Sequence, residues 1–372
     1  MNVSEAADQS TIVGMHGIIS ADTESTIANA FEQVRNAGTR SMVLDFSDVE
    51  GMDSPGISLL VKLYIQARRN RIKVLATGLR AEHRDVFRLT GLDEAISVRE
   101  TKSPETRAET PSMQGPEPGQ NRSSQVQPQA SREQQPSHAQ LWARPAPKLH
   151  VNLALKAAGE GLNVEARRPV GPIAGFGPMW EKTYELRLAD SKVEPSEVIQ
   201  ILKERLPEFQ PPQNQFRASP SGIKPGEIVL IRSSVLSVPI HTGVVVSYAD
   251  NLCFTLMTPQ GHPESGWVTF RAFKESNDTV CQIQGLARAN DPVYEIAFRF
   301  HGSKLQEGIW KHVLQSLAQH LGVPDGIKIK KQIVDPKVQW AQIPNVRHNA
   351  QILTIIYLML SPFRKLTKLA RK

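Results

Sequence analysis

The chain has 372 residues, of which 40% are hydrophobic and 22% charged, and its formal net charge at pH 7 is +7. This length and apolar content suit about two folded domains. No run reaches the roughly 20 apolar residues of a membrane-spanning helix, and the N-terminus lacks the charged-then-apolar pattern of a signal peptide. We therefore expect a cytoplasmic protein without a membrane span.

The first informative segment predicts a buried strand, a tight polar loop and a helix. The apolar run from Met42 to Phe46 is typical of a central strand that is covered on both faces. Ser54 then stands where a helix N-cap is expected, and Pro55 stands at the first helical position. Apolar residues recur at helical spacing after it and predict the buried face: Ile57, Leu60, Val61 and Tyr64. We expect Ser54 to be rigidly held and exposed enough to be modified.

The strand pair around TIVGMHGIIS, a helix from Thr23 to Ala37, the MDSPG loop, IKVLATGL and FRLTGLDEAISV together resemble the α/β STAS fold of bacterial anti-sigma factor antagonists. In that family the serine after the loop aspartate is phosphorylated by an anti-sigma kinase, and only the unphosphorylated form binds the kinase. The resemblance implies that Ser54 is the phosphate acceptor, preceded by Asp53, and that the partner is an anti-sigma factor or another protein kinase. Pro55 replaces the second Ser or Thr of many relatives.

The consequence of a phosphate on Ser54 is expected at a partner and not in the fold. Phosphorylation adds roughly −1.5 to −2 charges, which the helix N-terminus favours by ~0.3–1 kcal/mol and Asp53 opposes. A partner docked over this loop would instead meet like-charge repulsion. The alternative interpretation is that Ser54 is only a helix cap, worth ~1 kcal/mol.

A linker follows the first domain. The segment from Thr101 to Gln140 is rich in Pro, Gln and Ser, with Met113 and Val126 as its large aliphatic residues. Such a composition buries too little apolar surface to fold. We assign residues 1–100 to the first domain and 101–148 to a disordered linker, which leaves the two domains without a fixed relative orientation.

The second domain, residues 149–323, shows an α+β pattern. Trp180 to Leu188 alternates as a strand, with Lys182 on the same side as its apolar residues, and Pro195 opens a helix. Strand-like runs separated by turn residues then predict an antiparallel meander, and Ser303 to Leu321 has the spacing of a long amphipathic helix. This order predicts a helix-grip arrangement, in which a sheet wraps around one helix and encloses a cavity.

The segments GFGPMWEKTYEL, MTPQGHPESGWVTF and EGIWKHVLQSLAQHLGV resemble an uncharacterised family of the START-like, polyketide-cyclase-like (SRPBCC) group. That family has no established reaction, so the resemblance implies a fold and a pocket without a substrate. We expect the pocket to hold a hydrophobic small molecule or lipid. Six aromatic residues are its candidate lining, although aromatic residues in strands are also typical of a plain core: Trp180, Tyr184, Phe254, Trp267, Phe270 and Trp310.

His262 and Glu264 are candidates for a catalytic acid and base, because they stand on a turn between two strands. The alternative is that they are polar residues at a strand end, shaped by Pro263 and Gly266. We find no spacing typical of a metal site or of a cofactor loop. Cys253 and Cys281 lie in apolar runs, and we expect both to be reduced and buried.

The positive charge is concentrated in the expected tail, residues 324–372. This tail contains 10 Lys and Arg against 2 Asp and Glu, whereas residues 1–100 contain 11 against 14. Its last residues place the basic side chains on one helical face, opposite Phe363, Leu366 and Leu369: Arg364, Lys365, Lys368, Arg371 and Lys372. This pattern is typical of an interfacial helix on an anionic membrane, here the inner membrane face. The alternative is a helix packed on the protein. Nucleic acid is not expected as a partner.

Two interpretations follow for the whole chain. We favour a regulatory binding protein, in which a phospho-switch domain is linked to a domain that binds a hydrophobic small molecule or lipid. The alternative is an enzyme of cyclase or hydrolase type, with its activity in the helix-grip cavity and the first domain as regulator. A weaker alternative makes the first domain a scaffold in a lipid-transport assembly, with no phosphate on Ser54.

Overall fold

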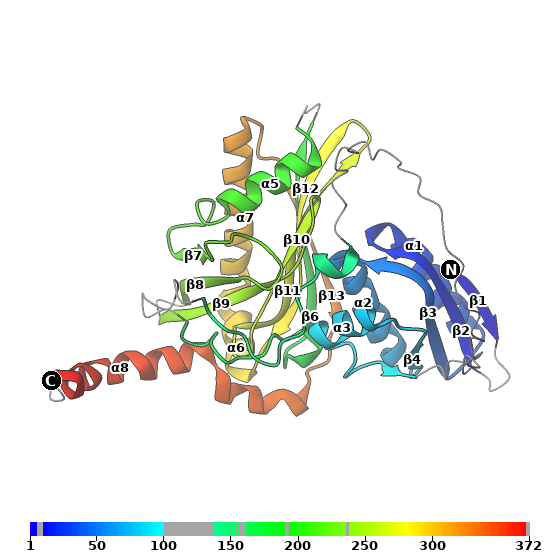
Figure 1. Cartoon of the computed structure of the whole chain (residues 1–372), viewed down its shortest axis with the longest axis horizontal. Helices are drawn as coiled ribbons and strands as arrows, with labels where there is room; N and C mark the ends of the chain where they lie inside the picture. The colour runs from blue at the N-terminus through cyan, green and yellow to red at the C-terminus, as the bar shows by residue number, and fades with distance from the viewer. Residues whose placement is uncertain are drawn as a thin grey trace, which may run out of the picture.

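The structure is a computed structural model that describes residues 1–5, 10–99, 137–152, 155, 161–189, 193–235 and 238–369. It contains a five-stranded sheet of order β1-β2-β3-β4-β5 and an eight-stranded sheet of order β13-β6-β12-β11-β10-β9-β8-β7. The first sheet belongs to the N-terminal domain and the second to the C-terminal domain. Figure 1 shows α2 and α3 between the two sheets.

The N-terminal domain is an α/β unit. Strand β1 pairs antiparallel with β2, while β2, β3, β4 and β5 are parallel neighbours. Its elements are β1 (Asn2–Glu5), β2 (Thr11–Ile19), α1 (Glu24–Asn36), β3 (Ser41–Met52), α2 (Ser54–Arg69), β4 (Lys73–Thr77), α3 (Ala81–Thr90) and β5 (Ser97–Val98).

Strand β3 is longer than the sequence predicts. The segment expected to be a polar loop continues the strand to Met52, because residues Asp48 to Met52 still pair with β2. Asp53 alone joins this strand to α2. The short connection fixes the start of the helix against the end of the strand.

The C-terminal domain is a curved antiparallel meander with helices on one face. Its elements are β6 (Met179–Leu188), α5 (Pro195–Arg205), β7 (Asn214–Ala218), β8 (Ile228–Val235), β9 (Val238–Ala249), β10 (Cys253–Met257), β11 (Glu264–Glu275), β12 (Asp278–Ala289), α6 (Pro292–Ala297), η4 (Phe298–Gly302), α7 (Ser303–Leu321), β13 (Ile327–Asp335), η5 (Trp340–His348) and α8 (Ala350–Leu369). The bounds expected for the long helix are confirmed, because α7 spans Ser303–Leu321.

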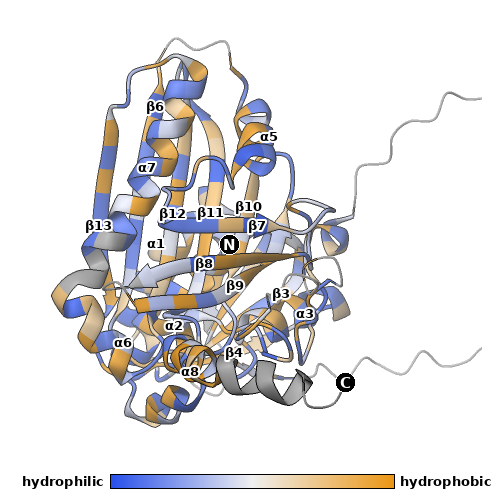
Figure 2. Cartoon of the chain, turned by 90° about the vertical axis from the view of Figure 1, so that its left-hand side faces the viewer, coloured by the Kyte–Doolittle hydropathy of each residue, from blue (hydrophilic) through white to orange (hydrophobic). Residues whose placement is uncertain are grey.

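The inner face of this sheet is covered by α7 and α5. Val313, Leu314 and Leu317 of α7 join Phe254 and Phe270 of the sheet in one buried cluster, which also contains Val198 and Leu202 of α5. Figure 2 looks onto α7 as it crosses this face of the sheet. The large antiparallel sheet with a long helix against it agrees with the expected layout, while membership of the helix-grip group stays a prediction.

The expected tail begins inside the sheet. Strand β13 pairs antiparallel with β6 from Ile327 to Asp335, so the C-terminal domain does not end at residue 323. The buried Arg288 of β12 holds the end of β13, since its guanidinium donates to Asp335 Oδ2 at 3.1 Å. Beyond it, η5 and α8 follow.

The two domains share a core, and the expectation that they lack a fixed orientation is wrong. One buried cluster contains Leu60 of α2 together with Tyr248, Trp267 and Leu286 of the second sheet. The outer face of that sheet thus packs on α2, which is buried on nearly all sides. A helix that is apolar all round is buried, and the segment from Ser54 to Val61 carries no charged side chain.

The predicted linker extends too far at its C-terminal end. Residues 101–136 lie outside the described residues, but the structure describes 137–148. This segment contains η2 (His138–Leu141) and Trp142, which forms an isolated bridge with Tyr248 of β9. Trp142 Nε1 also donates to the Met52 carbonyl at 2.8 Å, so the segment joins both domains.

Candidate functional site

The start of α2 holds the predicted switch residues, but the capping residue differs from the expectation. Asp53 is the N-cap, because its Oδ1 accepts a hydrogen bond from the backbone N–H of Gly56 at 2.7 Å. Ser54 is the first helical residue. The carboxylate reaches the third N–H of the helix, which is the ordinary capping geometry for an aspartate.

Ser54 is buried, and the expectation that it is exposed is wrong. Only 2% of its surface is exposed. Thr255 Oγ1 of β10 donates to Ser54 Oγ at 2.7 Å, and Thr269 Oγ1 of β11 lies 3.3 Å from the same atom. The two threonine hydroxyls are 2.9 Å apart. Three hydroxyls from three elements therefore meet where the N-terminal domain contacts the outer face of the second sheet.

Asp53 has an unusual titration in this position. Burial raises its pKa to about 7, and the nearby carboxylate of Asp250 raises it as well. The hydrogen bond from Gly56 and the guanidinium of Arg271 act in the opposite direction and do not cancel the effect of burial. Near neutral pH the group is thus divided between its protonated and ionised forms.

Polar contacts continue along α2. Trp267 Nε1 of β11 donates to Ser58 Oγ at 2.9 Å, one helical turn after Ser54. One turn further, Lys62 Nζ lies 3.0 Å from Glu181 Oε1 of β6, with both side chains largely buried. Burial lowers the pKa of Lys62, but the carboxylates of Glu181 and Glu24 outweigh it and the net shift is upward. The helix is thus matched to the sheet over its first three turns.

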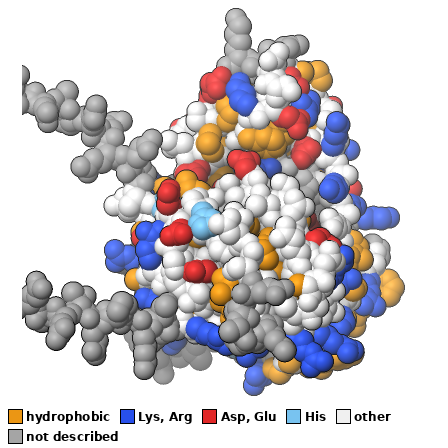
Figure 3. Space-filling view, turned by 90° about the vertical axis from the view of Figure 1, so that its right-hand side faces the viewer, with side chains coloured by type: hydrophobic (Ala, Val, Ile, Leu, Met, Phe, Trp, Pro, Cys, Tyr) orange, Lys and Arg blue, Asp and Glu red, His pale blue; other side chains and the backbone are white. Residues whose placement is uncertain are grey.

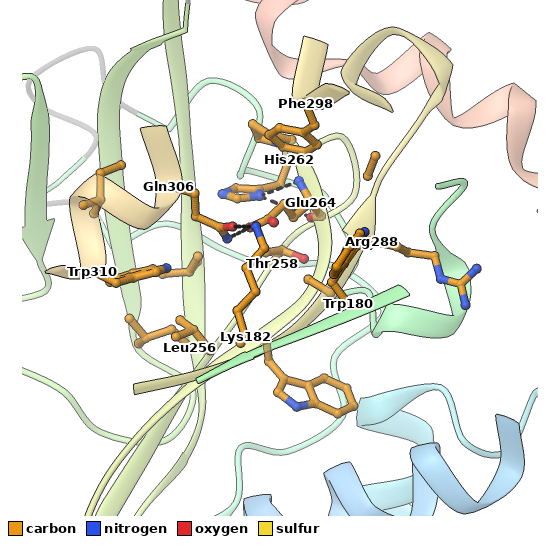
Figure 4. A pocket seen from close by; sticks show the side chains of 18 of the residues that line it. Trp180, Lys182, Leu256, Thr258, His262, Glu264, Arg288, Phe298, Gln306 and Trp310 are labelled. Atoms are coloured by element: carbon orange, nitrogen blue, oxygen red, sulfur yellow. Dashed lines mark hydrogen bonds between the residues drawn. The ribbon is translucent and has the colours of Figure 1, made fainter. Parts of the chain in front are cut away.

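A cavity of about 580 Å³ lies on the other side of the same sheet. Most of its wall is apolar and comes from strands β6 to β12, while α6, η4 and α7 close it. Figure 4 shows this cavity with part of its lining. Its lining includes Trp180, Lys182, Thr242, Leu256, His262, Glu264, Val268, Gly285, Gln306 and Trp310.

Three of the six aromatic residues predicted for the cavity are part of its wall: Trp180, Trp267 and Trp310. The indole nitrogen of Trp267 nevertheless bonds to Ser58 of the other domain.

The other three predicted residues do not line the cavity and belong to the buried core: Tyr184, Phe254 and Phe270. Phe254 stacks on Phe270 with ring centroids 4.6 Å apart, and Trp310 packs edge-on against Phe270 at 5.6 Å. The stacked rings fill the interior that they were expected to line.

A chain of polar side chains crosses one part of the cavity. Lys182 Nζ donates to Gln306 Oε1 at 2.6 Å, and Gln306 Nε2 donates to Glu264 Oε2 at 2.6 Å. Figure 4 shows the ends of these three side chains meeting at one point of the cavity. Burial lowers the pKa of Lys182 and raises the pKa of Glu264. We refer to Lys182, Gln306 and Glu264 as the polar chain.

His262 and Glu264 both line the cavity, but their side chains are not paired. His262 Nδ1 accepts a hydrogen bond from the backbone N–H of Glu264 at 3.1 Å. Burial lowers the pKa of His262 to about 4, so the imidazole is neutral at pH 7. Among the residues that the structure describes, no group of three or more His, Cys, Asp or Glu side chains is arranged to hold a metal ion.

Comparison with known proteins identifies the first domain. Residues 3–104 match the family model described as STAS domain. The N-terminal part of this chain is a STAS domain. The match begins at the second residue of β1 and extends past β5, so it includes nearly all of the first sheet and its helices.

Solved structures align with parts of the chain. An anti-sigma factor antagonist from Mycobacterium paratuberculosis is 26% identical over 27% of this chain and 85% of its own, with a TM-score of 0.23. The unphosphorylated anti-sigma factor antagonist SpoIIAA is 13% identical over 28% and 89%, with a TM-score of 0.22. The di-domain ARO/CYC StfQ of the steffimycin biosynthetic pathway is 10% identical over 39% and 53%, with a TM-score of 0.31.

Two features of the site were not found from the sequence. The contact between the STAS domain and the second sheet joins Ser54 to residues about 200 positions away, and no local pattern encodes such a pairing. The polar chain left a partial signal, because Lys182 occupies an inward position of a strand whose other inward residues are apolar. A lysine on a buried face is expected to have a polar partner.

Proposed function

We propose that this chain is a regulatory binding protein, in which the STAS domain is a switch and the C-terminal domain binds a hydrophobic small molecule or lipid. The observation that carries the proposal is that β10 and β11 serve both sites. Leu256 and Val268 face the cavity, while Thr255 and Thr269 in the same strands contact Ser54. A molecule in the cavity is thus separated from the predicted phosphate acceptor by a single β-sheet.

The STAS domain supports a regulatory role. By its resemblance to anti-sigma factor antagonists, the partner proposed for it is an anti-sigma factor or another protein kinase, and the modification proposed is a phosphate on Ser54. Asp53 would stand beside that phosphate and cap the same helix. Nothing in this assignment requires the second domain to be catalytic.

The lining of the cavity indicates the class of ligand. Cavities of about 300–1,000 Å³ with an apolar wall and few polar groups are typical of small-molecule sites. Here the polar chain supplies an ammonium group and a carboxyl group. Thr242 Oγ1 is buried in the wall without a hydrogen-bond partner among the described residues. We therefore propose an apolar molecule that carries a polar group able to reach this threonine and the polar chain.

The enzyme alternative has weaker support. It needs His262 and Glu264 to act together as base and acid. The Nδ1 atom of His262 instead contacts the main chain of Glu264, and the carboxylate of Glu264 accepts from Gln306. Both residues are accounted for as structural members of the cavity wall.

Replacing Gly285 with phenylalanine tests the cavity. A Cβ at Gly285 would meet no heavy atom within 4 Å, so the new ring is expected to extend into the cavity while β12 keeps its pairing. The affinity for anilinonaphthalene sulfonate, a fluorescent apolar anion, is expected to fall at least tenfold, or about 1.4 kcal/mol. Fluorescence titration measures it.

Gly308→Phe is the matched control. Gly308 also has open space around its Cβ position, but it lies on the exposed face of α7. Dye affinity in this variant should equal that of the wild type. An unchanged dye affinity in Gly285→Phe, with the fold intact by circular dichroism, would refute the proposed ligand site.

A contact with an anionic membrane is the further part of the proposed function. Helix α8 is anchored at its start, where Asn163 Nδ2 donates to the Ala350 carbonyl at 3.1 Å and Thr354 Oγ1 accepts from the His241 N–H at 3.2 Å. Beyond this anchor it projects from the body of the molecule (Figure 1) and exposes large apolar side chains: Ile352, Ile355, Ile356, Leu358, Met359 and Leu360.

The charge of this region favours a lipid surface over a second protein. From residue 336 to the end the sequence contains no Asp or Glu and seven basic residues: Lys337, Arg347, Arg364, Lys365, Lys368, Arg371 and Lys372. Figure 3 shows basic side chains gathered along the lower edge of the molecule, the side on which η5 and α8 lie. Arg371 and Lys372 lie outside the described residues, as do the side chains of Arg364, Lys365 and Lys368. No helix in the described ranges is long and apolar enough to cross a membrane.

Deleting residues 361–372 is expected to abolish binding to vesicles of phosphatidylcholine and phosphatidylglycerol. The deletion removes five basic residues, each worth about 1 kcal/mol near an anionic surface, and leaves the anchor at Ala350 and Thr354 in place. Co-sedimentation at low and high salt measures the binding. Vesicles of phosphatidylcholine alone are the control, and undiminished sedimentation of the shortened chain would exclude the end of α8 as the contact.

A further inference from the structure

We propose that the outer face of β10 and β11 is an intramolecular binding site for α2 of the STAS domain. This site accepts α2 only while Ser54 is unmodified, so that docking of the two domains and a phosphate on Ser54 exclude each other. The inference rests on the proposed role of Ser54 as a phosphate acceptor, but it does not depend on the ligand cavity. An external partner that uses the same face of α2 must first displace the second domain.

The geometry around the serine leaves no space for a phosphate. Ser54 Oγ already lies 2.7 Å from Thr255 Oγ1 and 3.3 Å from Thr269 Oγ1. These are direct hydrogen-bond distances, with the three side chains buried together. A phosphoryl group would place three additional oxygens in this volume. The second sheet must therefore move away before the group can be accommodated.

The charges at this contact act in the same direction. Asp53 precedes Ser54, and Asp250 is close enough to raise the pKa of Asp53. Arg271 acts in the opposite direction on Asp53, but its Nε donates to Gln282 Oε1 at 2.7 Å and its guanidinium lies over the ring of Phe273 at 4.4 Å. A dianionic phosphate in the closed contact would be buried next to two carboxyl groups, which is strongly unfavourable.

The contact is specific for a small, neutral side chain at this point. A hydroxyl of Ser54 satisfies the two threonine hydroxyls, and Ser58 in the next turn accepts the indole N–H of Trp267. Two short polar side chains on one face let the helix approach the sheet closely. This pairing of hydroxyl with hydroxyl is what a phosphate would destroy.

The order of events follows from the burial of Ser54. Transfer of the phosphoryl group requires the serine oxygen to attack the terminal phosphorus of a nucleoside triphosphate held by a separate protein kinase. The new O–P bond forms as the bond to the nucleoside diphosphate breaks, and the serine proton passes to a base of that kinase. None of this can occur in the docked molecule, so opening precedes modification, and the modified chain stays open.

The test compares Ser54→Asp with Ser97→Asp in the full chain. An aspartate at the first position of α2 suits the helix itself, so its effect is expected at the contact. We expect amide hydrogen exchange to rise at least tenfold in Ser54–Arg69, Cys253–Met257 and Glu264–Glu275, with a larger radius of gyration by small-angle scattering. Ser97 is exposed on the edge strand β5, and its variant should match the wild type.

Thr255→Asp provides a second, independent variant. It places the charge on the opposite side of the contact and leaves the STAS sequence unchanged. Docked domains with wild-type exchange in both Ser54→Asp and Thr255→Asp would overturn the proposal, whereas opening in either one with retained secondary structure supports it. Binding of anilinonaphthalene sulfonate in the same samples separates this proposal from that of the ligand site. A wild-type chain that does not bind the dye contradicts the ligand site and leaves the docking proposal untouched.

Discussion

Replacing Trp142 with alanine is expected to lower the free energy of unfolding by about 3–5 kcal/mol, the usual cost of truncating a buried tryptophan. The indole is 7% exposed and belongs to the core that both domains share. Its ring packs edge-on against Tyr248 at a centroid distance of 4.8 Å, and its nitrogen donates to the Met52 carbonyl. The variant thus loses contacts to both domains at once. Urea unfolding followed by circular dichroism measures the change.

Two further variants separate the contributions of Trp142. Trp142→Phe keeps an aromatic ring but loses the donor to Met52, and we expect it to cost about 1–3 kcal/mol for the unpaired carbonyl and the lost ring area. Trp340→Ala removes a tryptophan that is 72% exposed, and it should cost less than about 1 kcal/mol. A Trp142→Ala variant as stable as the Trp340→Ala variant would show that this side chain does not hold the domains together.

Stability is expected to depend on pH through Asp53. The pKa of this group is about 7 in the folded chain against an ordinary value of 3.8. The folded state binds the proton of Asp53 more tightly than the unfolded state does. The contribution of this proton to the free energy of unfolding is therefore fully present below pH 4 and is lost as the pH rises to 7. This loss is on the order of 2–4 kcal/mol.

Asp53→Asn isolates this effect from that of other groups. His262 has the opposite effect on stability. Because its pKa is lowered in the folded chain, stability is lost as the pH falls from 6.5 to about 4. An asparagine can still accept the hydrogen bond from Gly56, so the cap is retained. The stability difference between the variant and the wild type should grow in favour of the variant from pH 4 to pH 7. Asp85→Asn, on the exposed side of α3, controls for the loss of a carboxylate, and parallel profiles for Asp53→Asn and wild type would refute the prediction.

Local patterns in the sequence predicted the elements well, because each depends on near neighbours. The spacing of apolar residues gave α7 its bounds, and the strand Trp180 to Leu188 was found within one residue of β6 (Met179–Leu188). The position of Ser54 at the start of a helix was also found. Its environment was not, because burial of α2 on a second face depends on a sheet contributed by residues far along the chain.

One observation in the sequence does point to that second face. The eight residues from Ser54 to Val61 are all uncharged, although a surface helix normally alternates apolar and polar faces. The pattern shows that something covers the helix without showing what covers it. Trp142 was missed for a related reason, since a single aromatic residue after a long polar segment has no periodicity.

The interior of the second domain shows the same limit. Trp180 and Trp310 line the cavity as expected, but the sequence does not tell which aromatic rings stack and which leave space. Phe254 and Phe270 are paired across two strands and fill the region that they were expected to line. Lys182 and Gln306 are 124 positions apart, so the sequence indicates that this inward-facing lysine needs a polar partner but does not identify Gln306 as that partner.

The two faces of β10 and β11 take part in two different equilibria. The outer face takes part in docking to α2, and the inner face takes part in ligand binding in the cavity. A ligand that binds the cavity with different affinity in the docked and open forms changes the docking equilibrium by the ratio of the two affinities. Reciprocity then requires that a phosphate on Ser54, which favours the open form, changes the affinity for the ligand toward that of the open form. A tenfold ratio corresponds to about 1.4 kcal/mol, which is less than many single side-chain contacts contribute. Small adjustments of two strands would therefore suffice for the concentration of a metabolite to set the fraction of chains open to a kinase.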